Sequence, residues 1–149
     1  MKILVCGSRD WVNWRMIRRV LEKQPKDTEI LHGACRGADL LAAQTAVFLG
    51  LKVRAFHADW RRWGYAAGPI RNRLMLDEAP DKVFAFHENL ADSRGTVDCV
   101  GEAARRGIPV FVWGLDGTAR CWPSTVPPST SASPEPSSGL ADSSRPPSP

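Results

Sequence analysis

The hydrophobic and polar positions in the first half of the chain alternate between short apolar runs and longer stretches with helical spacing. A short, continuous apolar run predicts a strand buried on both faces, as in a parallel sheet. Such a run occupies residues 3–6, and two further strands are expected at 29–33 and 51–56. The stretches 11–24 and 38–49 between them predict helices. The order strand, helix, strand, helix, strand predicts a parallel sheet with right-handed crossovers.

Each of these two helices has an expected end and an expected buried face. Asp10 is expected to cap the first helix, and Gly50 to end the second. The side chains expected on the buried face of the first helix are Trp14, Ile17 and Leu21. Those expected on the apolar side of the second helix are Leu40, Leu41, Val47 and Phe48.

The second half begins with a loop at residues 58–73 that holds two Trp, the only Tyr and four Arg. Pro69 suits the first turn of a helix that carries Ile70, Leu74 and Met75 inward. The expected elements after it are a strand at 81–87, a helix that ends at Gly107 and a strand at 108–113. Pro109 favours an edge position or the start of that last strand. The sequence thus predicts a five-stranded, mostly parallel sheet.

The composition changes after Trp113, and Ser and Pro dominate residues 123–149. Such a segment cannot bury enough apolar surface to offset the entropy of ordering it. We therefore predict one domain over residues 1–113 and a disordered tail over 114–149.

Composition and charge narrow the class of protein. The net charge of +4 and the pI of about 9.1 suit a phosphate-bearing ligand, whereas nucleic-acid binders are usually more basic. The four Cys lack paired Cys-x-x-Cys spacings, so neither a structural zinc site nor a disulfide framework is expected. No signal peptide and no apolar segment long enough for a membrane are recognised, which favours a cytoplasmic protein.

The candidate chemistry lies where the predicted strands end, because open α/β sheets bind ligands at the carboxyl edge. Gly33 and Gly37 bring the backbone close to a ligand, and the N–H groups of the helix that follows favour an anion. Thr96 begins another helix and suits a phosphate, and Trp60, Trp63 or Tyr65 can stack on a base. The expected ligand-binding residues are Gly7, Ser8, Arg9, Asp10, His32, Gly33, Arg36, Gly37, Asp39, Trp60, Arg71, Asn72, Ser93, Arg94, Gly95 and Thr96.

Simpler interpretations stand beside these. Trp11 and Trp14 are expected to pack in the core, and His32 can simply bond a neighbouring backbone group. Asp39 can be a first-turn helix residue that interacts with the dipole and nothing else. Walker-type, Gly-x-Gly-x-x-Gly and Gly-x-Ser-x-Gly motifs are not found, which argues against a P-loop ATPase, an ordinary dinucleotide dehydrogenase and a serine hydrolase.

Five motifs in order resemble the YspA-like, YpsA-related branch of the SLOG superfamily. They are residues 5–10, 32–39, 58–60, 68–72 and 93–96. The resemblance implies a Rossmann-like three-layer α/β/α domain that binds a nucleotide or a nucleotide-derived ligand. Relatives include DprA proteins and phosphoribohydrolases, which cleave an N-glycosidic bond.

The resemblance also has an informative departure. Phosphoribohydrolases carry Gly-Gly-x-Gly-Thr-x-x-Glu, in which the Thr loop holds phosphate and the Glu is catalytic. Gly95 and Thr96 match this motif, but Ser93 replaces a Gly and Cys99 stands at the Glu position, with Glu102 one turn further on. The resemblance therefore supports phosphate binding more than hydrolysis.

Four functions remain as hypotheses. The first is binding of a nucleotide, phosphoribosyl or ADP-ribose-like ligand, with no further cofactor or metal. The second is N-glycosidic hydrolysis, in which Asp39 or Asp10 orients water and Arg71 stabilises the departing phosphoribose. The third is a sensor or sponge that holds a nucleotide without turnover. The fourth, DprA-like binding of single-stranded DNA, is disfavoured by the modest charge. The sequence also leaves open whether the chain forms a homo-oligomer.

Overall fold

The computed structural model describes residues 1–122, so residues 123–149 of the expected tail lie outside the described part. Six strands form one sheet in the order β3-β2-β1-β4-β5-β6. The strands are β1 Lys2–Gly7, β2 Glu29–His32, β3 Lys52–Ala55, β4 Lys82–Phe86, β5 Val110–Trp113 and β6 Ala119–Trp122. All neighbours pair in parallel except β5 and β6. The mostly parallel α/β prediction is confirmed.

The prediction of five strands is wrong by one strand. β6 pairs antiparallel with β5, Val110 opposite Trp122, and lies within the stretch expected to be tail. The sheet therefore continues past the predicted boundary at Trp113. β5 is an interior strand, and Pro109 directly precedes it, which agrees with the start position rather than the edge position.

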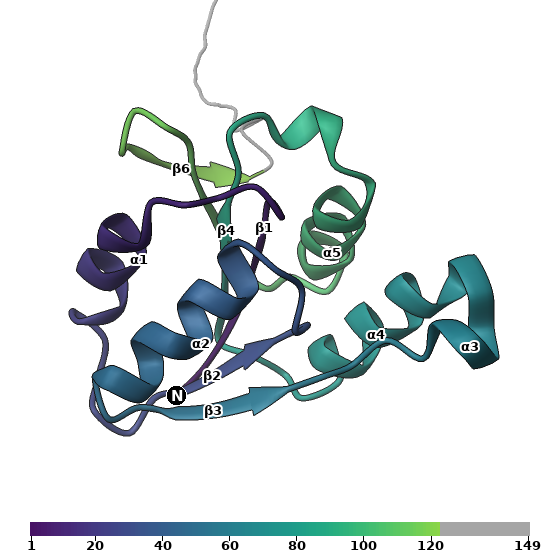
Figure 1. The fold of residues 1–149 in the computed structure, drawn as a ribbon, viewed down its shortest axis with the longest axis horizontal. Coiled ribbons are helices and arrows are strands. Elements are labelled where there is room, and N and C mark those ends of the chain that lie inside the picture. Colours follow the sequence, from purple (N-terminus) through teal and green to yellow (C-terminus); the bar gives the residue numbers. More distant parts are fainter. Residues whose placement is uncertain (123–149) are drawn as a thin grey trace, which may run out of the picture.

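Helices cover both faces of the sheet, as Figure 1 shows. The α-helices are α1 Trp14–Leu21, α2 Ala38–Phe48, α3 Trp60–Trp63, α4 Ala67–Leu76 and α5 Arg94–Arg105, and the short 3-10 turns are η1 Gly64–Ala66 and η2 Leu90–Asp92. α1 and α2 close one hydrophobic core with the sheet, and α4 and α5 close a second core on the opposite face. The fold is therefore a three-layer α/β/α domain.

Two local predictions about helix starts are corrected. Asn13, not Asp10, caps α1, because its side-chain oxygen accepts a hydrogen bond of 3.1 Å from the backbone N–H of Met16. The segment 58–73 is mostly helical rather than a loop, since α3, η1 and α4 follow one another from Trp60.

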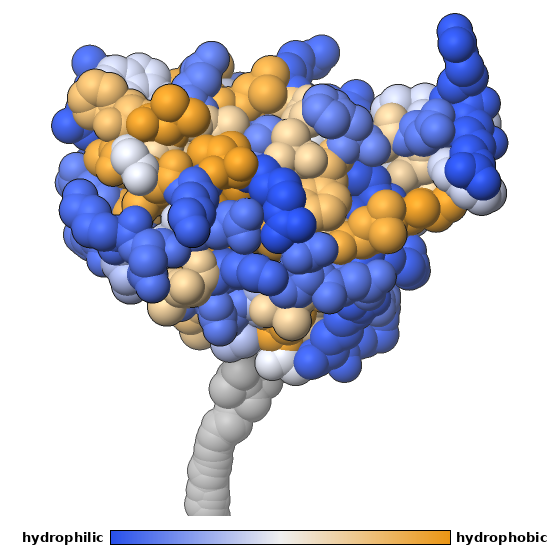
Figure 2. Space-filling view, turned by 90° about the horizontal axis from the view of Figure 1, so that it is seen from below, coloured by the Kyte–Doolittle hydropathy of each residue, from blue (hydrophilic) through white to orange (hydrophobic). Residues whose placement is uncertain are grey.

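The buried face of α2 differs from the one expected, because of the four large apolar residues only Leu41 packs, partly buried, against the core. Val47 and Phe48 are 68% and 71% exposed, whereas Ala38, Ala42 and Ala46 are fully buried. Alanine side chains let the helix backbone lie close to the sheet, and the bulky side chains then point away from it. Large apolar groups consequently gather on the outside, and Figure 2 shows apolar side chains grouped on the surface of the molecule.

α4 departs from the expected pattern in a similar way. Leu74 is 53% exposed although an inward position was expected, while Met75 is buried as predicted. Arg71 and Asn72 are buried instead. A charged and an amide side chain thus point toward the interior, where a purely structural helix would place apolar groups.

The strand order reverses between β1 and β4, the arrangement that opens a ligand crevice in doubly wound sheets. The backbone N–H of Ser8 donates to the Phe86 carbonyl at 2.8 Å and so holds the two strand exits together. The first turns of α2 and α5 flank this point from the two faces of the sheet. The fold therefore brings the loops of the expected site to one edge.

Candidate functional site

A cavity of about 300 Å³ lies at the carboxyl edge of the sheet, beside the ends of β1 and β4. Residues from β1, the 33–37 turn, α2, α4 and α5 line it together. The expected site residues among them are Gly7, Arg9, Asp39, Arg71, Asn72, Ser93, Arg94, Gly95 and Thr96. Segments far apart in the sequence therefore meet at one cavity, as the strand exits predicted.

The first turn of α5 forms one wall. The Ser93 hydroxyl accepts a hydrogen bond of 3.1 Å from the Thr96 N–H and so caps the helix. Thr96 is buried. The space beside Gly95 is open, because a Cβ at this position would meet no atom within 4 Å. The first N–H groups of a helix have no partner within it, and the dipole gives that end a partial positive charge. Together with exposed Arg94, this wall suits an anion.

Arg71 reaches the cavity from the opposite side, on α4. Its guanidinium is 8% exposed and donates to the Gly33 carbonyl at 2.6 Å and to Asn72 Oδ1 at 3.0 Å. Within residues 1–122, no carboxylate forms an ion pair with it. A buried cation whose hydrogen-bond partners are neutral groups can attract an anionic ligand.

Asp39 is the buried carboxylate of the cavity lining. It is 5% exposed and accepts hydrogen bonds from the backbone N–H groups of Gly33 at 2.8 Å and Cys35 at 3.5 Å. Burial raises the pKa of Asp39 to about 6, although these N–H groups and the charges of Arg71 and Arg9 act in the opposite direction. A carboxyl group with such a pKa can exchange protons near neutral pH.

These contacts change the expected role of the 33–37 turn. Its N–H groups were predicted to hold an anion, but those of Gly33 and Cys35 bind Asp39 and that of Ala38 binds the Ser8 carbonyl at 3.0 Å. The Asp39 carboxylate thus occupies the place of the expected anion. The open helix N-terminus of the cavity is that of α5.

Glycine is required at two positions in the turn because other chains approach closely. A Cβ at Gly33 would lie 2.6 Å from Arg71 Nη1, and a Cβ at Gly37 would lie 2.2 Å from the Ser8 carbonyl oxygen. Gly37 also has a φ of +80°, which favours glycine. These two glycines let the backbone pack against the Arg71 guanidinium and the Ser8 carbonyl, and the close approach to a ligand expected from the sequence stays a prediction.

Other predicted residues lie outside the cavity lining. His32 is buried, and its Nδ1 accepts a hydrogen bond of 3.0 Å from the Ala34 N–H, which matches the simpler interpretation. Burial, with His57 and Arg71 nearby, lowers the pKa of His32 and favours this neutral form. The Ser8 hydroxyl accepts from the Asp10 N–H at 3.0 Å. Asp10 itself forms an exposed ion pair of 3.5 Å with Arg36.

Arg36 and Trp60 line a second, shallower cavity of about 320 Å³ together with Arg9, Ala34 and Cys35. Arg9 and Cys35 border both cavities. Three of the four arginines in the expected set, Arg9, Arg36 and Arg94, therefore lie on adjoining cavities rather than on separate sides of the molecule.

Five further residues line the main cavity and were missing from the expected set: Cys6, Cys35, Met75, Asp92 and Cys99. Met75 and Cys99 lie one helical turn after Arg71 and Thr96, so helical spacing from the motif residues indicates them. Cys6 and Cys99 are buried, as expected for small core residues. A contact with Cys99 and burial raise the pKa of Cys6.

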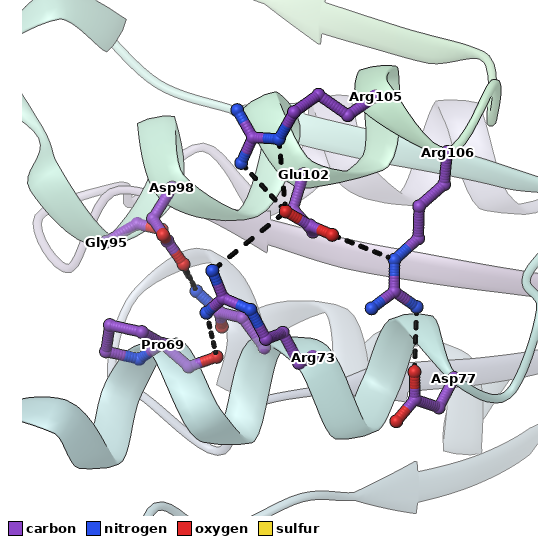
Figure 3. A network of polar contacts seen from close by, with 9 residues as sticks. Pro69, Arg73, Asp77, Gly95, Asp98, Glu102, Arg105 and Arg106 are labelled. Atoms are coloured by element: carbon purple, nitrogen blue, oxygen red, sulfur yellow. Dashed lines mark hydrogen bonds and ion pairs between the residues drawn. The ribbon is translucent and has the colours of Figure 1, made fainter.

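Glu102, the nearest carboxylate after the expected catalytic position, does not line the cavity and lies in a polar network between α4 and α5 (Figure 3). It accepts from Arg105 at 2.8 Å and from Arg106 at 3.1 Å, and Arg106 also bonds Asp77 at 2.8 Å. The side chain at the Glu position is the Cys99 thiol. The site therefore lacks the phosphoribohydrolase carboxylate.

Asn72 connects the same two helices at the cavity. Its amide donates to the Gly95 carbonyl at 3.3 Å and to Asp98 Oδ2 at 3.0 Å. The orientation of the α5 first turn is thus set by α4, which also carries Arg71.

No group of three or more His, Cys, Asp or Glu within residues 1–122 is arranged to hold a metal ion. None of the helices described is both long enough and apolar enough to cross a bilayer.

Three comparisons with known proteins bear on the site. A family model described as "YAcAr: YspA, cpYpsA-related SLOG family" matches residues 1–63, which include the first two strand exits but not Arg71 or Thr96. The "Gene 61 protein" of Mycobacterium phage D29 is 34% identical over 124 residues, covering 76% of this chain and 96% of that protein.

The solved structure of DNA processing protein A (DprA) from Streptococcus pneumoniae is similar with a TM-score of 0.62 and 21% identity. The similarity covers 78% of this chain and 52% of DprA, so the chain spans about half the length of that protein. At this identity the likeness concerns the fold.

Proposed function

Because the chain belongs to the YspA, cpYpsA-related SLOG family, we propose that it binds a nucleotide or nucleotide-derived ligand at the carboxyl edge of its sheet. The ligand is held mainly through a phosphate. The observation that carries this proposal is that Arg9, Arg71 and Arg94 line one cavity with the N-terminus of α5.

The phosphate lies at the first turn of α5 in this proposal. Free N–H groups there donate to its oxygens, the Thr96 hydroxyl adds a further donor, and Arg94 supplies a charge-assisted hydrogen bond. Arg71 approaches from α4 with a charge that no carboxylate among residues 1–122 pairs with. The groups thus surround an anion from two helices.

Binding is favoured over turnover by the residues at the expected catalytic position. Cys99 replaces the carboxylate of the phosphoribohydrolases, and Glu102 is held by Arg105 and Arg106 outside the cavity. A sensor or sponge that holds a nucleotide without converting it agrees with this arrangement.

A hydrolase remains a second candidate because of Asp39. Its buried carboxyl group lines the cavity and has a pKa of about 6, which suits proton transfer near neutral pH. As a hydrolase, the protein would use Asp39 to orient water for attack on an N-glycosidic bond and Arg71 to stabilise the departing phosphoribose.

The test compares ligand binding with product formation. Thermal stabilisation and calorimetry are measured with nucleoside 5′-monophosphates, ADP-ribose and the matching nucleosides, because binding to the native state raises its stability. Free base is followed by chromatography. Binding without base release supports the sensor, whereas base release that Asp39→Asn abolishes supports the hydrolase.

The phosphate contact is tested by Thr96→Ala. We expect it to weaken the binding of phosphate-containing ligands about 10- to 150-fold, the loss of one hydrogen bond to a charged group, and to leave the binding of nucleosides unchanged. Thr45→Ala is the control, since Thr45 is also a buried helical threonine but lies outside the cavity. An equal loss for nucleosides and nucleotides would contradict the phosphate role.

A further inference from the structure

We infer that the shallow cavity beside the main one is a binding site for the aromatic base of the ligand, and that Trp60 forms its stacking surface. This inference rests on the proposed function. In this inference the phosphate binds at the first turn of α5 and the base binds at α3, so the ligand extends across both cavities.

The two cavities are continuous in their lining. Arg9 and Cys35 border both, so a ligand that leaves the main cavity past these residues enters the space lined by Ala34, Arg36 and Trp60. The main cavity of about 300 Å³ is at the small end of the range for ligand sites, and the second adds about 320 Å³. The combined space suits a ligand longer than a phosphorylated sugar.

The indole of Trp60 is held in position but not covered. Asp59 caps α3 through a hydrogen bond of 3.1 Å to the Arg62 N–H, which fixes the turn that carries Trp60. The indole lies over Gly68, where a Cβ would be 3.3 Å from its Cη2 atom. Trp60 nevertheless remains 50% exposed and lines the second cavity.

The other aromatic residues of this segment do not offer the same surface. Trp63 has the Arg62 guanidinium 4.6 Å from its ring centroid, and neither cavity includes it. Tyr65 is fully exposed and lines neither cavity. Of the three aromatic residues that the sequence offers for stacking on a base, Trp60 is thus the one that borders a cavity.

The opposite wall comes from the turn after β2. Ala34 adopts a φ of +60°, an uncommon conformation for a residue with a Cβ, and its N–H is held by His32 Nδ1 at 3.0 Å. Arg36 is held by the Arg9 carbonyl at 3.3 Å and by Asp10. Such strained backbone positions concentrate at binding sites. A base between this turn and Trp60 would stack on the indole, with arginine planes at its edge.

Calorimetry with AMP and ribose 5-phosphate tests the inference, because the two share a phosphorylated ribose and differ in the base. We expect the wild-type chain to bind AMP more tightly than ribose 5-phosphate. Trp60→Ala should weaken AMP binding about 5- to 150-fold, the usual range for one stacked base, and leave ribose 5-phosphate within about twofold. Trp60→Phe should recover much of the loss, and Trp63→Ala should change neither ligand.

The possible failures are separable. If the wild-type chain binds neither probe, the proposed function and the base site both fail. If it binds ribose 5-phosphate but binds AMP no more tightly, or if Trp60→Ala leaves AMP unchanged, the phosphate site stands and the base site is refuted. If Trp60→Ala weakens both probes equally, Trp60 supports the cleft without contacting a base, which also refutes the inference.

Discussion

The buried carboxyl group of Asp39 makes a quantitative prediction about stability. Its ordinary pKa of 3.8 rises to about 6 in the folded chain, chiefly through burial. The folded state therefore binds this proton more tightly than the unfolded state. It follows that the contribution of Asp39 to stability is largest at low pH and is lost as the pH rises from about 4 to about 6.

The magnitude follows from the two pKa values. Their difference corresponds to about 3 kcal/mol at 1.36 kcal/mol per pKa unit. Between about pH 4.5 and about pH 7, where most proteins can be handled, about 2 kcal/mol of this should be lost. This is a sizeable part of the stability of a small domain.

Asp39→Asn isolates the effect, because asparagine keeps the shape and can still accept the Gly33 N–H without titrating. Urea unfolding of wild type and variant, followed through tryptophan fluorescence, to which buried Trp11 contributes, gives both free energies at each pH. We expect wild type to lose about 2 kcal/mol relative to the variant across the interval. Subtracting the two curves removes the titration of other carboxylates, such as Glu78, whose pKa is lowered by Arg54.

Two outcomes would refute the reasoning. Parallel curves would mean that Asp39 titrates alike in the folded and unfolded chain. A gain of wild-type stability with rising pH would mean that the charges of Arg71 and Arg9 outweigh desolvation and hold the carboxylate ionised.

Two glycine substitutions test the geometry of the turn after β2. Gly37→Ala should lower the free energy of unfolding in urea by more than about 2 kcal/mol, because its Cβ would meet the Ser8 carbonyl. Gly50→Ala is the control, since Gly50 has a similar φ of +78° but open space around it, and it should cost about 1 kcal/mol. Equal losses in the two variants would show that the contact with Ser8 is unimportant. Gly33→Ala should displace the Arg71 guanidinium and weaken the binding of AMP, measured by calorimetry, at least about 10-fold, the loss of one charged hydrogen bond. An unchanged affinity for AMP would mean that Arg71 does not contact the ligand.

The positions of the site loops could be predicted from sequence because topology alone determines them. Each buried strand ends at a polar or glycine-rich segment, and parallel strands end at one edge. The burial of Arg71 could not be predicted from periodicity, since Leu74 is the more apolar residue of that helix and lies outside. Arg71 was expected at the site because it lies in the polar segment 58–73 and in the motif 68–72 that resembles the family. The family model itself matches residues 1–63 and does not extend to Arg71.

The errors have a common physical origin. Periodicity assumes that the largest apolar side chains face the core, but α2 packs through Ala42 and Ala46 and exposes Phe48. β6 was missed because it is a four-residue edge strand, and three of its residues are exposed. Its pairing with β5, rather than its own hydrophobicity, orders it. Tertiary contacts thus decide where local patterns are weak.

Arg71 and Asn72 are neighbours on α4, yet they bond opposite sides of the cleft: the Gly33 carbonyl on one side and the Gly95 carbonyl on the other. The separation of the two sides is therefore governed by one helix. A substitution that shifts this helical turn should therefore disturb the contacts to Gly33 and to Gly95 together.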